Sequence, residues 1–321
     1  MNKYRGEIDG LRGVAILGVI IYHAEILFFN KQLFTGGFLG VDIFLVISGF
    51  LITRIINNEY TKERKFSFKK FYQRRFRRLV PALTAVVIIS TIFAFFTLYP
   101  SQFLFFLKSA FSSIFFFSNI FFHYAGESYG QSVLTTIPLL HTWSLSLEEQ
   151  FYLFFPIILF IIYKFREDKI NLFLILFFLI SFIFAITINP KHPSFNFYML
   201  PSRGWEFILG ALLAVNEKKF YFRQNSLWPS LFSYVGLILI FYSYINLEST
   251  NEHPGLNTLL PTFGTALIIF SSSSNNYINF ILSNNIIKKL GLISYSLYLW
   301  HHPIFSFSKI LGFNNDDITI K

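Results

Sequence analysis

The sequence predicts an all-α protein, a polytopic transmembrane helix bundle. Of its 321 residues, 54% are hydrophobic and only 14% are charged. Apolar stretches recur along the whole chain, and most approach the ~20 residues that one helical span of a bilayer needs. Lys and Arg gather in short segments between these stretches, as they do in the loops of membrane proteins. We therefore expect residues 1–321 to form a single membrane domain.

The composition excludes several kinds of function. The chain has no cysteine, which rules out disulfides, thiolate chemistry and cysteine-based metal sites, and we predict neither a metal site nor a bound cofactor. The net charge of +10 would favour nucleic acid if the basic residues lay on a soluble surface. Because they lie between apolar stretches, they indicate membrane topology and anionic lipids or ligands, and we predict no nucleic-acid partner.

The first helix is expected to remain on the mature chain. Lys3 and Arg5 precede an apolar stretch, as in a signal peptide, but Glu7 and Asp9 interrupt the basic region. No small-residue cleavage site follows, and a second apolar stretch begins almost at once. In order, the apolar segments are residues 11–29, 37–56, 79–99, 103–122, 145–163, 170–188, 203–215, 230–247, 257–273 and 292–312.

Basic loops orient these segments. The loop 57–78 carries a dense run of Lys and Arg, so this loop and the N-terminus are predicted to be cytoplasmic. The loop 248–256 contains glutamates and neither Lys nor Arg, which suits the outer side. Later basic loops are also assigned to the cytoplasm: 164–169, 216–229 and 274–291.

These loop assignments agree only if the segment 103–122 does not cross the membrane. It contains Lys108 and several serines, so we expect a re-entrant or interfacial helix there. About nine crossings then remain, counted from the apolar segments above. The segment 203–215 is short for a span and is expected to be buried among other helices.

His23 is an ionisable residue inside the first apolar segment. Such residues are functional candidates by default, although a histidine near a helix end is about as often an ordinary hydrogen-bonded side chain. Arg12 lies eleven residues earlier, which is close to three helical turns. Both side chains therefore share one helix face, about 16 Å apart along its axis, and we interpret this face as part of a transmembrane active site.

A carboxylate is predicted to accompany His23. Asp42 lies near the start of the next helix, which the short connection makes antiparallel, at about the same depth. A carboxylate bound to one imidazole nitrogen fixes the tautomer and leaves the other nitrogen as a base. Glu148 and Glu149, at the start of a later helix, are alternatives, although these acids could simply favour a helix N-terminus. Two further polar residues are expected on this outer side: Arg203 and Glu206.

The stretch FYQRRFRRLVP (residues 71–81) holds the densest positive charge. Its Arg74, Arg75 and Arg78 lie where the chain meets the membrane, and the planar guanidinium group suits phosphates and pyrophosphates. A cytoplasmic polyanionic cosubstrate and lipid headgroups are both plausible partners. Ordinary positive-inside topology also accounts for such a loop.

Six stretches together indicate a family. In chain order they are IDGLRGVAILGVIIYH (with Arg12 and His23), GGFLGVDIFLVISGFLIT (with Asp42 and Ser48), RRFRRLVP, HTWSLSLEEQFYLFFP, SRGWEFILGALLA and SYSLYLWHHPIF. With their spacing, these stretches resemble acyltransferase family three, the integral-membrane O-acyltransferases that include bacterial O-antigen acetylases. The resemblance covers essentially the whole chain.

The resemblance implies a reaction and a location. An acyl group, most often acetyl, would pass from cytoplasmic acetyl-CoA to a hydroxyl of an extracytoplasmic glycan such as lipopolysaccharide. The protein would cross the bacterial cytoplasmic (inner) membrane several times, with membrane lipids, acyl-CoA and the glycan acceptor as its partners. We expect His23 to act as general base, oriented by Asp42, Glu148 or Glu149. Arg12, Arg74, Arg75 and Arg78 are the expected donor-binding residues, and the other pocket candidates are Ser48, Arg203, Glu206 and His301.

The end of the chain departs from the family pattern. Members usually continue past the Leu-Tyr-Leu-Trp-His motif into a further helix, and many carry a soluble SGNH-type domain. Because this chain stops at Lys321, we expect the usual final helix and the soluble domain to be absent, as in a truncated or minimal member. A membrane transporter or flippase of an envelope precursor, and an inactive truncated homologue, are the alternative interpretations.

Overall fold

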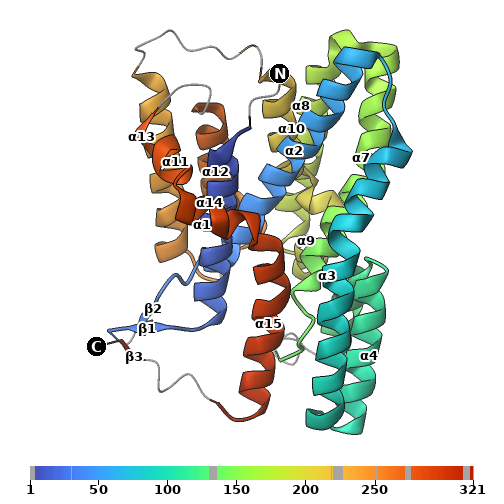
Figure 1. Ribbon diagram of the computed structural model, residues 1–321, viewed down its shortest axis with the longest axis vertical. Helices are drawn as coiled ribbons and strands as arrows, with labels where there is room; N and C mark the ends of the chain where they lie inside the picture. The colour runs from blue at the N-terminus through green and yellow to red at the C-terminus, as the bar shows by residue number, and fades with distance from the viewer. Residues whose placement is uncertain are drawn as a thin grey trace.

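The computed structural model describes residues 4–29, 31–129, 136–217, 219, 227–249, 252–271, 276–313 and 319–320. Figure 1 shows a bundle of helices, with the N-terminus at one end and the C-terminus beside a small sheet towards the other. The helices are α1 (Gly6–His23), α2 (Gly40–Glu63), α3 (Phe68–Thr97), α4 (Pro100–Ile114), α5 (Ser118–Tyr129), α7 (Thr142–Arg166), α8 (Ile170–Ile188), α9 (Pro193–Tyr198), α10 (Leu200–Asn216), α11 (Trp228–Asn246), α12 (Leu259–Ser271), α13 (Tyr277–Leu282), α14 (Asn285–Leu292) and α15 (Ser294–Ile310).

The remaining elements are short. Three 3-10 turns, η1 (Gly37–Leu39), η2 (Glu167–Lys169) and η3 (Leu256–Thr258), precede α2, α8 and α12. The strands are β1 (Leu27–Phe28), β2 (Lys31–Gln32) and β3 (Thr319–Ile320). In the sheet, β1 pairs antiparallel with β2 and parallel with β3.

The all-α membrane fold class is confirmed. Four helical segments in the described part of the chain are long and apolar enough to cross a membrane: Gly37–Glu63, Phe68–Thr97, Thr142–Ile188 and Trp228–Asn246. Large apolar side chains are exposed along α3, α8 and α11, as expected where a helix faces lipid. The chain is therefore a polytopic membrane helix bundle, and its count of nine crossings stays a prediction.

The basic segment 57–78 differs from the predicted loop. Helix α2 continues to Glu63 and α3 begins at Phe68, so only the turn 64–67 separates them. Ser67 caps α3, because its hydroxyl accepts a hydrogen bond from the backbone N–H of Lys70. The loop was predicted from its high charge, but Arg and Lys are good helix formers, so a charged segment can be helical. The arginines consequently lie on the first turns of a helix, where their side chains have fixed directions.

The segment 103–122 is broken into two helices. Helix α4 ends at Ile114, Phe116 has a left-handed backbone with φ of 57°, and α5 begins at Ser118. The two helices contact each other, and α4 also packs against α3. Residues 100–129 thus form no single helix of span length, in agreement with the loop charges, and their depth in the membrane stays a prediction.

Helices α2 and α10 lie close together and parallel. A Cβ atom on Gly49 would lie 1.9 Å from the backbone oxygen of Phe207, and one on Gly210 would lie 2.0 Å from that of Val46. Only glycine permits this approach of two backbones. The prediction that the short segment 203–215 is buried is confirmed, and the contact brings the polar starts of α2 and α10 together.

Candidate active site

His23 is the last residue of α1, so the helix ends well before the predicted residue 29. Its Nδ1 lies 2.9 Å from the backbone oxygen of Val19. A carbonyl oxygen can only accept, so Nδ1 carries the hydrogen and donates it, and Nε2 keeps a free lone pair. A backbone carbonyl of α1 therefore fixes the His23 tautomer, the role that the sequence analysis expected a carboxylate to have.

Three other histidines form a cluster with His23. The His23 ring centroid lies 5.1 Å from that of His301 and 5.3 Å from that of His302, both on α15. His141, at the start of α7, lies 5.4 Å from His301 and stacks on His302 at 5.2 Å. We call these four residues the histidine cluster. The sequence prediction included His301 but missed His141 and His302, although both occur in the quoted motifs HTWSLS and LWHHP.

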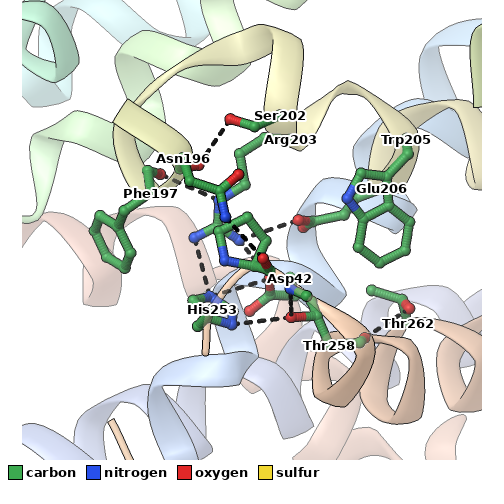
Figure 2. Close-up of polar contacts among 12 residues, drawn as sticks. Asp42, Asn196, Phe197, Ser202, Arg203, Trp205, Glu206, His253, Thr258 and Thr262 are labelled. Atoms are coloured by element: carbon green, nitrogen blue, oxygen red, sulfur yellow. Dashed lines mark hydrogen bonds and ion pairs between the residues drawn. The ribbon is translucent and has the colours of Figure 1, made fainter. Parts of the chain in front are cut away.

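Asp42 has a different partner from the one predicted. Its Oδ1 lies 2.5 Å from Nη1 of Arg203, which also donates to Glu206 Oε1 at 3.1 Å (Figure 2). All three side chains are almost completely buried. A buried carboxylate requires a countercharge, and the parallel contact of α2 with α10 supplies it from Arg203. The predicted pairing of Asp42 with His23 is therefore wrong.

His253 joins this buried ion cluster from a loop. Arg203 Nη2 donates to its Nε2 at 3.0 Å, so Nδ1 carries the hydrogen and donates to Thr258 Oγ1, also at 3.0 Å (Figure 2). Burial lowers the pKa of His253 to about 4, although Asp42 acts in the opposite direction. His253 is thus neutral at physiological pH. No periodic pattern marks a residue in a loop such as 248–256, so the sequence did not reveal it.

A cavity of about 770 Å³ is lined by arginines from three helices. We call it the arginine cavity, and its arginines are Arg5, Arg12, Arg54, Arg75 and Arg78. Arg5 and Arg54 were not among the predicted donor-binding residues. Both form ion pairs with Glu217, each with an N–O distance of 2.9 Å. Arg74 lies outside this lining, because its side chain is 58% exposed and points to Glu59 at 3.9 Å.

Of the glutamates of α7, Glu148 lines the arginine cavity, and Glu149 contacts Arg75, another residue of its lining. Glu148 accepts hydrogen bonds from Ser48 and Tyr152. Arg75 lies 3.5 Å from the centre of the Tyr152 ring and 3.3 Å from Glu149 Oε1. Because α7 begins at Thr142, both acids lie further along the helix than predicted. The prediction that either of them orients His23 is wrong.

A second cavity, of about 920 Å³, contains His23, His253 and His302, and we call it the histidine cavity. Its walls include residues 140 and 143, several residues of 189–198, and residues 249, 252 and 253 of the loop 248–256, which was predicted to lie on the outer side. Its other lining residues are mainly aromatic or polar. They include Tyr22, Phe38, Trp143, Phe197, Tyr198, Phe305, Gln32, Asn189, Glu252 and Lys309.

The two cavities are separated by little more than one helical turn. On α7, Trp143 lines the histidine cavity and the next residue, Ser144, lines the arginine cavity. On α15, Tyr298 lines the arginine cavity and His302 lines the histidine cavity, about 6 Å further along the helix. The arrangement can hold a polyanion on one side of the partition and present a histidine base on the other.

Comparison with known families identifies the class. The family model described as an acyltransferase domain matches residues 5–319, so the chain belongs to this acyltransferase family. The resemblance seen in the six motifs is thereby confirmed. No solved structure matches the chain significantly.

The following relatives are named as O-acetyltransferases, one of them as putative. The chain is 31% identical over 319 residues to the peptidoglycan O-acetyltransferase OatA of Listeria monocytogenes, covering 94% of this chain and 50% of that protein. It is 34% identical over 325 residues to a putative O-acetyltransferase of Staphylococcus aureus MSSA476, covering 95% of this chain and 51% of that protein. It is 31% identical over 319 residues to the O-acetyltransferase OatA of Staphylococcus aureus NCTC 8325, with 95% and 51% covered. The chain thus spans about half the length of these relatives.

Proposed function

We propose that this protein transfers an acyl group, in the first instance acetyl, from acyl-CoA to a hydroxyl of a cell-envelope glycan. The observation that carries the proposal is the pair of cavities one turn apart, one lined by arginines and the other by histidines. The donor binds in the arginine cavity on the cytoplasmic side, and the acceptor binds in the histidine cavity on the outer side. Family membership supports the same chemistry.

The arginine cavity suits the phosphates of coenzyme A. Arg12 and Arg78 line it from α1 and α3, and the nearest carboxylate to Arg12 is Asp9 at 3.8 Å, beyond hydrogen-bond length. Like charges gathered in a cavity attract a polyanion, and guanidinium groups bind phosphate oxygens in pairs. Arg75 and Arg54 contribute further positive charge. We assign Arg12, Arg75 and Arg78 to the donor site and remove Arg74 from it.

His23 acts as the general base towards the acceptor. The acceptor hydroxyl gives its proton to Nε2, whose lone pair is free because Nδ1–H is bound to Val19. A positioned base of this kind typically contributes ~10²–10⁴-fold in rate. His23 lines the same cavity in which a sugar would lie, so the base and the hydroxyl meet there.

The acceptor is proposed to be a cell-wall glycan. The Listeria relative is named for peptidoglycan, which favours that class over the lipopolysaccharide expected from the O-antigen acetylases. Aromatic faces such as Trp143 and Phe197 can pack against the C–H face of a sugar ring, and Asn189 and Glu252 can bind its hydroxyls. The protein is placed in the bacterial cytoplasmic membrane with its N-terminus inside.

The proposal is tested with purified protein in sealed vesicles. Acetyl-CoA carrying a labelled acetyl group is supplied on the side of the arginine cavity, and a peptidoglycan fragment on the other. We expect labelled ester on the glycan and free coenzyme A on the donor side. Movement of acetyl-CoA or of the fragment across the membrane without ester formation would instead identify a transporter.

A further inference from the structure

His301 lies inside the partition between the two cavities. It is 5% exposed and is buried between Tyr298, which lines the arginine cavity, and His23, which lines the histidine cavity. Its ring centroid lies 5.2 Å from that of Tyr298 and 5.1 Å from that of His23. The side chain of His301 thus lies between a residue that lines one cavity and a residue that lines the other.

The two nitrogens of His301 are in different states. Nδ1 lies 2.6 Å from the backbone oxygen of Tyr298, so it carries the hydrogen and donates it. Nε2 is buried and has no hydrogen-bond partner in the part of the chain that the structure describes. Leaving a buried polar atom unpaired is costly, so a lone pair held in this way indicates a chemical role. Nε2 of His301 is therefore a potential nucleophile: its lone pair is unpaired, and the hydrogen bond of Nδ1 fixes the tautomer.

The other members of the histidine cluster lack this combination. Among the described residues, neither ring nitrogen of His141 makes a hydrogen bond of normal geometry, although the backbone of Leu299 lies near the ring. His302 donates from Nδ1 to the backbone oxygen of Pro138 at 3.2 Å, but it already lines the histidine cavity. His301 combines a tautomer held by a short hydrogen bond with a place between residues of the two cavities.

We propose that His301 is the nucleophile that carries the acyl group from the arginine cavity to the histidine cavity, as an acyl-imidazole. His23 then serves only the second half of the reaction, as the base that activates the acceptor. This proposal rests on the proposed function, because it assumes an acyl-CoA donor on one side and a hydroxyl acceptor on the other.

The two half-reactions balance. In the first, Nε2 of His301 bonds to the thioester carbonyl carbon, the C–S bond breaks, and coenzyme A leaves as a thiolate that takes a proton from water. The product is an acyl-imidazolium that keeps its Nδ1 hydrogen on Tyr298. In the second, the acceptor oxygen bonds to the same carbon while its proton passes to Nε2 of His23, and the C–N bond to His301 breaks. His23 then releases the proton to water in the histidine cavity.

The thioester reaches His301 by displacing Tyr298. The hydroxyl groups of Tyr298 and Ser144 are joined at 2.6 Å, and Tyr298 also donates to the backbone oxygen of His141 at 3.0 Å. These hydrogen bonds close the arginine cavity against the histidine cluster. When they open, the acyl end of the donor can approach Nε2 while the coenzyme A phosphates stay among the arginines.

The test measures coenzyme A release in the absence of acceptor. Purified wild-type protein, mixed with acetyl-CoA alone, should release a burst of about one coenzyme A per protein and retain labelled acetyl. His23→Gln should keep this burst but lose turnover when peptidoglycan fragment is added. His301→Gln and His301→Asn should lose the burst and about 10²-fold or more of turnover. Retained acetyl-CoA binding in these variants shows that they are folded.

Each other outcome overturns the proposal. If wild type transfers acetyl to the glycan but shows no burst, transfer is direct. If His23→Gln loses the burst and His301→Gln keeps it, His23 carries the acyl group. If wild type forms no ester at all, the proposed function fails first, and the two failures are thus distinguishable. His123→Gln is the matched control and should behave as wild type. His123 is also a buried histidine, bound through Nδ1 to Ser194 at 2.9 Å, and it is not among the residues that line either cavity.

Discussion

The arginine cavity and the histidine cavity differ in how their residues are distributed along the chain. All the arginines of the first cavity come from the first 78 residues: Arg5 directly precedes α1, and the others lie on α1, α2 and α3. The second cavity combines the end of α1 with residues of α7, α9, α15 and the loop around His253. A cluster of arginines on consecutive helices can be predicted from the sequence. A cavity lined by residues from distant parts of the chain cannot. We proposed that the donor binds in the first cavity and the acceptor in the second, and the following predictions test that division.

The largest effect is expected at His23. His23→Gln removes the free Nε2 lone pair and should lower acetyl transfer to the glycan by about 10²–10⁴-fold. Binding of acetyl-CoA should not change, because His23 lies outside the arginine cavity. Both quantities are measured on detergent-purified protein of verified size. A transfer rate close to that of wild type would remove His23 as the base.

Arg203 should matter for stability. Arg203→Met leaves the buried carboxylates of Asp42 and Glu206 without their countercharge, which typically costs about 3–5 kcal/mol. Thermal unfolding in detergent measures the loss, and adding Asp42→Asn should recover part of it. Arg64→Met is the control, because its ion pair with Glu167 is exposed and should contribute little. Equal melting temperatures for both arginine variants would contradict the buried cluster.

The arginines should affect the donor alone. Arg12→Gln or Arg78→Gln removes a charge-assisted hydrogen bond to phosphate worth about 1.5–3 kcal/mol, and should raise KM for acetyl-CoA about 10–100-fold. KM for the glycan should stay constant. Arg74→Gln should leave both constants unchanged, since Arg74 points to Glu59 outside the cavity. A large increase in KM for acetyl-CoA in Arg74→Gln would show that Arg74 also belongs to the donor site.

Trp143 should show the opposite pattern. Its ring lines the histidine cavity, and an aromatic contact is worth about 0.5–1.5 kcal/mol. Trp143→Ala should therefore raise KM for the glycan about two- to tenfold with little change in KM for acetyl-CoA. Trp143→Phe keeps an aromatic face and should retain most of the affinity. If Trp143→Ala raises KM for acetyl-CoA instead, the two cavities are not separate binding sites.

His253 should produce the smallest effect at neutral pH and a larger one in acid. Its pKa is about 4 in the folded protein against 6.5 for an ordinary histidine, so the unfolded chain binds a proton more readily. Its contribution to stability is complete above pH 6.5 and is lost as pH falls towards 4. Unfolding followed across this range should show the loss, and His253→Gln, which can still accept from Arg203 and donate to Thr258, should reduce it. A variant with the same pH dependence as wild type would exclude His253 as the source.

Several parts of the site followed from local sequence. Arg12 and His23 lie on one helix because eleven residues close nearly three turns, and the structure shows that Arg12 lines one cavity and His23 the other. The arginines near Pro81 were identified from charge, and two of the three line the arginine cavity. The six motifs identified the family without any contact between them being known.

The sequence determined the membrane class, the family and the single-helix relation of Arg12 to His23, because hydrophobicity, charge and helical period are local properties. Only the tertiary structure decided which groups face one another. The contact of α2 with α10 pairs Asp42 with Arg203, and Glu148 lines the arginine cavity while Glu149 binds Arg75. His301 and His302 lie next to His23, and His141 lies next to both of them. The physical reason is that helix packing, and the burial of charge that accompanies it, joins residues that are far apart in the chain.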